Sequence, residues 1–400
     1  MPTRPKLRWI CGGLLTLAAP ARARAIPAFA RLYHASCSMC HDPIPRLSAF
    51  GERFAANGYR FGAGQGPTDT IATGDPLLAL PSQLRLAMRL DAYAAAYTGG
   101  RFATDFQTPY SLKLISGGPL TGQLSYYVYF LLSEQGATGD VEDAFLTWND
   151  VAGSPVSVTV GQFQLADPMF AREQRLEYQD FAIYRARIGD APMDLTYDRG
   201  LMLGADLAGF GLTAAVVNGN GSVAAGNNGR LDDDPNKSFL LHASRAVAPG
   251  LTLGALGYAG RQRGAATGGP TLDDDVTMLG GDVTVAASPL TLRAQYIHRE
   301  DTRPTFTAGE PTAVTDGGFG ELLLHRPGSR WYGVALYNLI TTSKPLLDVD
   351  LGGPTGLSRY ETLTGGGGYL MQRNVRVYGE ATWDRGLQAM QWTLGLTMAF

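Results

Sequence analysis

Cys37, Cys40 and His41 are the residues of this sequence whose types and spacing indicate a specific chemistry. Two cysteines separated by two residues and followed at once by histidine form the attachment site for a c-type haem. The thiols lie one helical turn apart, so each can add to a vinyl group of the porphyrin, and the next residue places an imidazole under the iron. We therefore predict one covalent haem c, held by Cys37 and Cys40, with His41 as an axial ligand of the haem iron.

The alternative interpretation is a redox-active or structural C-x-x-C pair that an incidental histidine follows. The sequence contains only three cysteines in 400 residues. The third, Cys11, falls in a segment that we expect to be removed, so both remaining cysteines belong to the motif. This distribution favours the haem interpretation.

The sequence offers several candidates for the second axial ligand, which sets much of the haem potential. Met39 lies inside the attachment loop and is badly placed, and His34 lies one turn before the motif, on its wrong side. Further along the chain, Met202, His242 and His325 are candidates from the region that we assign below to a barrel. An open or water-bound site is the remaining alternative.

Residues 1–25 have the pattern of a secretory signal peptide. Arg4, Lys6 and Arg8 form a positive start, residues 9–19 are a short apolar core, and residues 23–25 read Ala-Arg-Ala, a typical cleavage site. We expect the mature chain to begin near residue 26 and to leave the cytoplasm. After this segment no run approaches the roughly 18 to 20 apolar residues of a transmembrane helix.

Residues 26–61 are predicted to form a small helical monohaem cytochrome c module around the motif. Prolines interrupt the chain just after His41, and a second helix can run from Pro45 to Asn57, with Gly58 as its stop. The apolar residues of that helix share one face, which could pack on the porphyrin or form a plain core; they are Leu47, Phe50 and Phe54. About 36 residues cannot bury a normal core alone. Residues 62–81, rich in Gly, Pro and Thr, are the expected linker.

From residue 82 onward, apolar residues alternate with polar or small ones, for example over 84–91, 156–160 and 290–296. This period of two is typical of strands with lipid on one face and a lumen on the other. The 51 glycines, 18 tyrosines and 17% charged residues also suit an outer-membrane barrel. The net charge of -3 and the lack of basic tracts give no sign of a nucleic-acid partner.

The connections between these segments allow the strands to be counted. Seven are tight turns, near residues 116–119, 152–155, 208–211, 248–250, 287–289, 326–329 and 371–374. Eight are generally longer, near residues 98–105, 133–140, 165–198, 219–237, 261–274, 299–316, 342–358 and 385–390. Residues 82–400 are therefore predicted to be mainly β, a sixteen-stranded antiparallel transmembrane barrel that ends on Phe400 with both chain ends at the periplasm. A secreted β-sandwich is the alternative.

The longest of these connections, residues 165–198, follows the fifth strand and is expected to fold inward and narrow the pore. Its charged side chains could line the constriction; they are Arg172, Glu173, Arg175, Glu177, Arg185 and Arg187. In the alternative, residues 181–188 only extend a strand beyond the membrane.

The N-terminal residues resemble the start of the fused outer-membrane monohaem cytochrome and porin family, whose members are proposed as iron oxidases. The resemblance rests on residues 27–31, the motif, and the later residues Pro45, Leu47, Phe50-Gly51, Phe54 and Asn57-Gly58-Tyr59. Residues 160–163 and 217–221 resemble phosphate-selective-type porins. Only about 35 residues carry specific motifs. The resemblance implies a haem module that plugs a sixteen-stranded barrel, and it carries over to Cys37, Cys40 and His41.

The predicted function is electron transfer across the bacterial outer membrane. A single haem cannot span a hydrocarbon layer of roughly 30 Å, but within the lumen it could be approached from both sides. The resemblance implies extracellular Fe(II) as electron donor and periplasmic electron-carrier cytochromes as acceptors, so the activity would be that of an Fe(II)-oxidising cytochrome. The alternatives are a diffusion porin whose haem plug senses redox state, and electron export to an extracellular acceptor.

Acidic clusters in the expected exterior loops could raise the local concentration of cations. They are Asp232-Asp233-Asp234, Asp273-Asp274-Asp275 and Glu300-Asp301. The alternative is that these are solvated loops, or loops that bind divalent ions among lipopolysaccharides.

Overall fold

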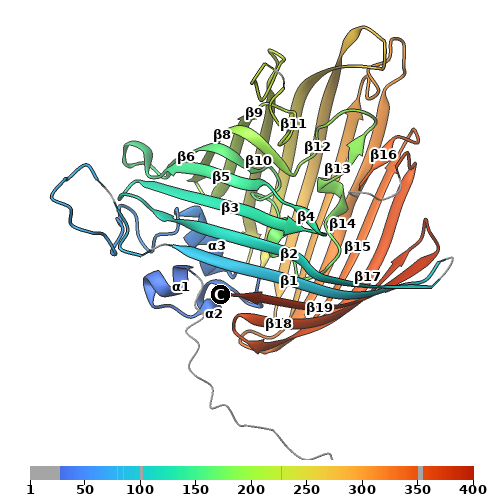
Figure 1. Cartoon of the computed structure of the whole chain (residues 1–400). Coiled ribbons are helices and arrows are strands. Elements are labelled where there is room, and N and C mark those ends of the chain that lie inside the picture. Colours follow the sequence, from blue (N-terminus) through green and yellow to red (C-terminus); the bar gives the residue numbers. More distant parts are fainter. Residues whose placement is uncertain (1–27, 79, 84, 100–101, 227, 350–354) are drawn as a thin grey trace, which may run out of the picture.

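The computed structural model describes residues 28–400 except 79, 84, 100–101, 227 and 350–354. The expected signal peptide, residues 1–25, lies outside the described residues. A large ring of strands dominates the molecule, and short helices lie at one end of it (Figure 1). These helices are α1 (Ala28–Tyr33), α2 (Cys37–Cys40) and α3 (Ala49–Ala56). None of the helices in the described part of the chain is long and apolar enough to cross a membrane.

The ring is an antiparallel barrel in which each wall strand pairs with the next along the chain. Its first half contains β1 (Leu86–Tyr97), β2 (Ala103–Pro119), β3 (Leu124–Glu134), β5 (Val141–Trp148), β6 (Val156–Gln164), β8 (Tyr197–Leu207), β9 (Phe210–Val217) and β10 (Ser238–Ala248). The second half contains β11 (Leu251–Ala265), β12 (Thr271–Ala287), β13 (Leu290–Asp301), β14 (Ala313–His325), β15 (Trp331–Thr342), β17 (Arg359–Gln372), β18 (Val375–Asp384) and β19 (Ala389–Ala399).

The barrel closes where the last strand pairs with the first, from Arg89 opposite Ala399 to Tyr97 opposite Gln391. The sheet contains seventeen strands in the described residues. One of them, β4 (Ala137–Thr138), only extends the hairpin of β3 and β5. The wall itself therefore has sixteen strands, which confirms the barrel and the strand count expected from the sequence.

The tight turns and the longer connections alternate as predicted, so the two ends of the barrel differ. We call them the short-turn end and the loop end. Some boundaries differ from the prediction. In one case β2 continues to Pro119, so that the turn falls at residues 120–123, and in another β11 and β12 extend into the loop expected at 261–274. In the first case, the backbone N–H groups of Leu120 and Thr121 bond to the carbonyl of Leu124 and close the turn there.

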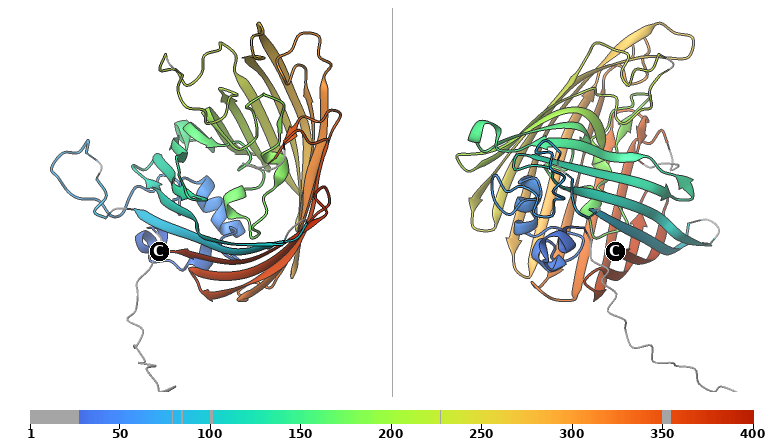
Figure 2. Two further views of the ribbon diagram at one scale, coloured as in Figure 1. Left: turned by 45° about the vertical axis from the view of Figure 1, so that its right-hand side comes forward. Right: turned by 60° about the vertical axis from the view of Figure 1, so that its left-hand side comes forward.

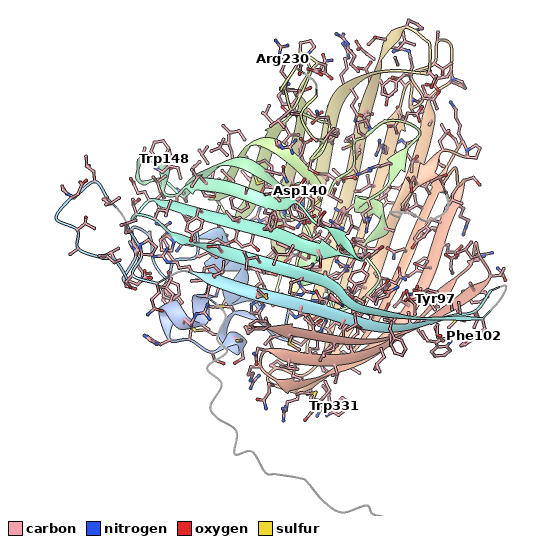
Figure 3. All side chains as sticks on the ribbon, viewed as in Figure 1. Tyr97, Phe102, Asp140, Trp148, Arg230 and Trp331 are labelled. Carbon is pink, nitrogen blue, oxygen red and sulfur yellow. The ribbon has the colours of Figure 1, made fainter. Side chains whose placement is uncertain are left out.

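Side chains alternate between the lumen and the outer surface. On β14, the odd-numbered residues from Ala313 to His325 are mostly buried in the interior, whereas Leu322 and Leu324 are exposed on the outer face. Buried polar side chains on the inner faces of other strands include Asp91, Ser111, Lys113, Arg376 and Glu380. Figure 3 shows Trp148 and Trp331 near the short-turn end, and Phe102 and Arg230 at the loop end. A polar interior inside an apolar wall is the arrangement of a membrane barrel.

Residues 165–196, here called the third loop, fold into the barrel (Figure 2). Phe170, Phe181 and Tyr184 are almost completely buried in the main apolar cluster. The segment contains η2 (Arg172–Gln174), η3 (Ala182–Tyr184) and β7 (Arg187–Ile188), which pairs with β16 (Leu347–Asp348). The inward fold is confirmed. The alternative, that residues 181–188 extend a wall strand, is wrong. Within this segment β7 pairs with β16, which lies in the connection between β15 and β17, and not with a strand of the wall.

The outer wall gives a test of the barrel in a bilayer. Leu394 points outward from β19 and is 65% exposed, between Trp392 and Leu396 on the same face. We expect Leu394→Arg to lower the free energy of unfolding in a bilayer by about 2–4 kcal/mol, the cost of a charge on the lipid face. The loss is measured by titration with urea, with the folded fraction at each concentration determined from electrophoretic mobility. Leu387→Arg, in the exposed connection between β18 and β19, should leave stability unchanged; equal losses would contradict this orientation.

Candidate haem site at the short-turn end

Residues 28–61, here called the N-terminal module, bring Cys37, Cys40 and His41 together. Ser36 caps α2, and its hydroxyl accepts a hydrogen bond from the N–H of Ser38 at 3.4 Å. The next turn carries the two cysteines, and the backbone N–H of His41 closes the helix on the carbonyl of Cys37 at 2.9 Å. Both cysteines are free thiols. The helix thus presents two thiols one turn apart, directly before an imidazole.

The imidazole of His41 is oriented by its own chain. Its Nδ1 atom lies 2.7 Å from the carbonyl oxygen of Pro45. Because a carbonyl only accepts, Nδ1 carries the proton and donates it, and Nε2 keeps its lone pair. Burial lowers the pKa of His41, which favours the neutral ring. A neutral imidazole held through Nδ1 is the form that binds a metal through Nε2.

The two thiols lack the features of a reactive dithiol. Burial raises the pKa of Cys37 and also that of Cys40. Redox-active C-x-x-C pairs depend on a lowered thiol pKa, because the thiolate is the nucleophile. The raised thiol pKa values thus speak against a redox-active pair, and the orientation of His41 beside the two thiols is the feature that fits a haem.

The start of α3 differs from the prediction. The helix begins at Ala49 rather than near Pro45, because the hydroxyl of Ser48 caps it by accepting from the N–H of Gly51 at 3.2 Å. Its end agrees with the prediction, since Gly58 follows with φ +63°. The delayed start leaves the carbonyl of Pro45 outside the helix, where it can accept from His41.

Gly51 allows α3 to lie directly on α2. A β-carbon at this position would lie 2.0 Å from the carbonyl oxygen of Cys40 and 2.9 Å from a methyl group of Leu47. The backbone N–H of Ser48 also donates to the carbonyl of Cys40 at 2.8 Å. Close backbone approach is therefore built into the segment that carries the motif.

Aromatic side chains surround these helices. Phe54 is the centre of the group, with ring centroids 5.6 Å from Phe29, 5.5 Å from Tyr33, 6.4 Å from Phe50 and 5.4 Å from Phe61. Such rings supply the apolar surroundings that a porphyrin face requires. The thiol spacing, the free Nε2 and this aromatic shell fit a covalent haem.

The N-terminal module is held in the barrel mouth by charged contacts with several wall strands. Arg46 and Glu321 form an ion pair in which the residues are only 4% and 0% exposed. Three further pairs join the module to the barrel: Asp42 with His325 at 2.7 Å, Arg60 with Asp150 at 3.0 Å and Glu52 with Arg293 at 3.6 Å. The ring of Tyr59 also stacks on Tyr127 of β3, with centroids 5.6 Å apart. These contacts seat the module inside the short-turn end.

The third loop rests on the same wall strand as the module. On the inner face of β14, Phe319 stacks on Phe181 of the third loop with centroids 4.2 Å apart, and Leu323 lies in one apolar cluster with Leu176. Glu321 and His325, which alternate with them, bind the module. One strand face thus joins the module and the third loop.

The charged residues predicted to line the constriction differ in their ion-pair partners and in their burial. Arg172 pairs with Asp180, Glu173 lies 2.5 Å from Lys113, and Arg187 lies 2.8 Å from Asp194. Arg175 and Arg185 are half-buried and approach Asp180 at 4.0 and 3.8 Å. Glu177 is buried. Most of these charges are therefore paired within the loop or with the wall.

The structure also places the candidates for the second axial ligand. His34 and Met39 are exposed on the module. His242 is buried and its Nε2 lies 2.8 Å from Asp282, while His325 uses both ring nitrogens, on Asp42 and on the carbonyl of Trp331. Met202 packs beside the apolar cluster of the third loop. Iron binding by Nε2 of His242 or by His325 would require one of these hydrogen bonds to break.

Four of the eight carboxylates in the acidic clusters of the exterior connections form ion pairs with Arg or Lys. Asp273 lies 2.8 Å from Arg263, Asp275 lies 2.5 Å from Arg261, and Asp232 lies 2.5 Å from Lys237. Asp301 pairs with Arg299 at 2.7 Å. Within the described residues, no group of three or more His, Cys, Asp or Glu side chains is placed to hold a metal ion. These clusters therefore give little support to a cation site.

Comparison with known proteins identifies the barrel architecture. No protein-family model matches the chain, and no curated protein sequence matches it. An anion-selective porin from Comamonas acidovorans is similar in structure, with a TM-score of 0.56 and 10% identity over 80% of this chain and 99% of the porin. OmpT of Vibrio cholerae, lacking its loop L8, gives a TM-score of 0.54 and 12% identity over 80% and 99%. The fold is a closed sixteen-stranded antiparallel barrel like those of outer-membrane porins.

Gly51 provides a test of the candidate site. We expect Gly51→Ala to separate α3 from α2 and to destabilise the N-terminal module by about 1–3 kcal/mol, as overpacking does. The covalent haem content per folded barrel, measured by absorbance and haem staining, should fall. Gly62→Ala is the matched control, because a β-carbon there would meet nothing within 4 Å. Full haem content in the Gly51 variant would contradict this packing.

Proposed function

We propose that this protein transfers electrons across the bacterial outer membrane through one haem c that Cys37 and Cys40 attach in the mouth of the barrel. The observation that carries the proposal is the arrangement at His41: Nδ1 donates to Pro45 and leaves Nε2 available. The porin-like barrel supports the outer-membrane location. The seating of the N-terminal module at the short-turn end supports a haem on the periplasmic side of the lumen.

The side chains of the module would each have a distinct role. Cys37 and Cys40 would tether the porphyrin, and His41 would bind the iron through Nε2, with the carbonyl of Pro45 fixing its ring. The aromatic group around Phe54 would keep water from the porphyrin face. When bound, the haem iron accepts and releases one electron at a time. No proton transfer is required of these residues.

Extracellular Fe(II) is the proposed electron donor, and periplasmic electron-carrier cytochromes are the proposed acceptors. Each ferrous ion would enter the lumen from the loop end and lose one electron to the haem, and the ferric product would leave by the same end. Support for iron comes from the family resemblance of the N-terminal residues. The paired exterior carboxylates argue against a dedicated iron site in the described loops, so iron would react at the haem by collision.

The second candidate function is an outer-membrane diffusion porin in which the N-terminal module is a redox-sensing plug. The porin architecture and the polar lumen favour this function directly. Electron export to an extracellular acceptor would use the same structure as the first proposal and differs only in relative potentials. Electron transfer and conduction are measured separately, so the candidates can be distinguished.

The first test is the reaction with iron. The purified oxidised protein is mixed with ferrous iron under anoxic conditions while the haem absorption bands are followed. We expect rapid reduction in the native chain and none in Cys37→Ser/Cys40→Ser, which should lack covalent haem. A native protein that dithionite reduces but ferrous iron does not would exclude iron as donor. A native protein without covalent haem would exclude the cytochrome function.

The second test is conductance in planar bilayers. We expect low conductance in the native chain and a several-fold higher value in Arg46→Met, because Glu321 would lose its ion-pair partner while a second buried carboxylate, Glu177, lies beside it, and this should unseat the module. The double variant Arg46→Met/Glu321→Leu should conduct poorly again, because it removes both charges. Arg53→Met, on the exposed face of α3, is the matched control. High native conductance would favour the diffusion porin.

A further inference from the structure

An exposed apolar loop lies between the N-terminal module and the first strand. The described residues of 69–82, which leave out residue 79 and are here called the linker loop, carry four aliphatic side chains on the surface: Ile71 at 48% exposure, Leu77 at 94%, Leu78 at 45% and Leu80 at 40%. Clusters of this kind on a folded surface mark sites of contact with membranes or proteins. The sequence predicted only a linker here.

The linker loop has a defined internal structure. Its two sides meet at an antiparallel bridge between Thr70 and Pro81, and the N–H of Ile71 donates to the carbonyl of Leu80 at 2.9 Å. At its tip the carboxylate of Asp75 accepts from the N–H of Leu77 at 2.8 Å. The aliphatic side chains are therefore presented by a hydrogen-bonded hairpin rather than by an extended linker.

The base of the linker loop is fixed to the barrel. Arg85, which is almost fully buried, lies 2.6 Å from the carboxylate of Asp69 and donates to the carbonyl of Pro119 at the end of β2. Just before the loop, the chain passes over the turn between β2 and β3, where a β-carbon on Gly122 would lie 2.7 Å from the carbonyl oxygen of Gly64. The chain thus leaves the lumen across the rim of the barrel.

The tip of the linker loop projects beyond the barrel wall. Figure 1 shows it as the pale blue loop at the left, and the left view of Figure 2 shows it outside the outline of the barrel. It leaves from the short-turn end, where Leu124, Leu146 and Trp148 on neighbouring strands are exposed outer-face residues. A loop in this position extends sideways toward the periplasmic edge of the apolar wall.

The residue types at the tip of the linker loop favour lipid over protein as its partner. Between residues 70 and 83 the only charged residue is Asp75, and its carboxylate is engaged with the backbone of the loop. A protein-binding loop commonly adds aromatic or arginine anchors, whereas the large apolar side chains of this loop are all aliphatic. Aliphatic side chains beside a lipid-facing wall match acyl chains.

We propose that the linker loop inserts Leu77, Leu78 and their aliphatic neighbours into the periplasmic leaflet of the outer membrane. It would act as a lateral anchor that fixes the chain between the N-terminal module and β1. The proposal rests on the membrane location given under the proposed function. It does not depend on the haem or on the direction of electron flow.

Site-directed spin labelling in lipid vesicles tests the proposal. A nitroxide is attached at Leu77→Cys or Leu78→Cys in the full chain, and its collisions with oxygen and with a water-soluble nickel chelate are compared. The native chain gives the background. We expect an oxygen-to-nickel accessibility ratio several-fold higher than at Leu387→Cys, an exposed leucine of a loop-end connection.

A label at Val160→Cys, on the outer face of β6, reports the membrane location of the barrel itself. A lipid-like ratio at residues 77 and 160 supports the anchor. A water-like ratio at residue 77 with a lipid-like ratio at residue 160 overturns the anchor alone. Water-like ratios at both positions overturn the membrane location and the anchor with it. A label at residue 77 that neither reagent reaches indicates a protein contact and also overturns the proposal.

Discussion

The buried ion pair of Arg46 and Glu321 is the interaction on which the relation between the two parts of this molecule depends. Burial of both charges is expensive, and such pairs often add little net stability. The pair nevertheless restricts how the N-terminal module can sit in the barrel mouth, because either charge without the other would be strongly unfavourable at that buried position. Since Arg46 follows His41 by five residues, the pair also determines where in the barrel mouth the imidazole lies. Position, rather than stability, is its main contribution.

The barrel wall was largely predictable from the sequence, because it depends on local rules. Side chains alternate strictly along each strand, and turns of Gly, Pro and Asn recur at the same end, so β14 or β19 can be recognised from its own residues. The inward fold of residues 165–196 could be predicted from the length of this connection and its position after the fifth strand, where sixteen-stranded porins have an inward-folded loop. The C-x-x-C-H motif is equally local, and the structure adds the hydrogen bond to Pro45 that makes its histidine suitable for iron.

The contacts between the parts were not predictable in this way. Arg46 and Glu321 are 275 residues apart, and nothing in either neighbourhood identifies the other. One signal was present: Glu321 and Arg293 occupy inward positions of strands, where an isolated charge requires a partner. The start of α3 was missed because Pro45 was predicted to lie in its first turn. The N-cap formed by Ser48 determines the start instead. The linker loop was missed because a Gly- and Pro-rich segment gives no sign of its own hydrogen bonds.

The large sequence separation of the seating contacts has a consequence for assembly. The N-terminal module is synthesised before any strand, whereas its partners on β13 and β14 come late in the chain. Until those strands are in place, the module can contact only the early part of the barrel, through Tyr127 of β3 and Asp150, and the barrel mouth is not closed around α2. The haem attachment proposed above would therefore be able to precede insertion of the barrel, which would then enclose a module that already carries its haem.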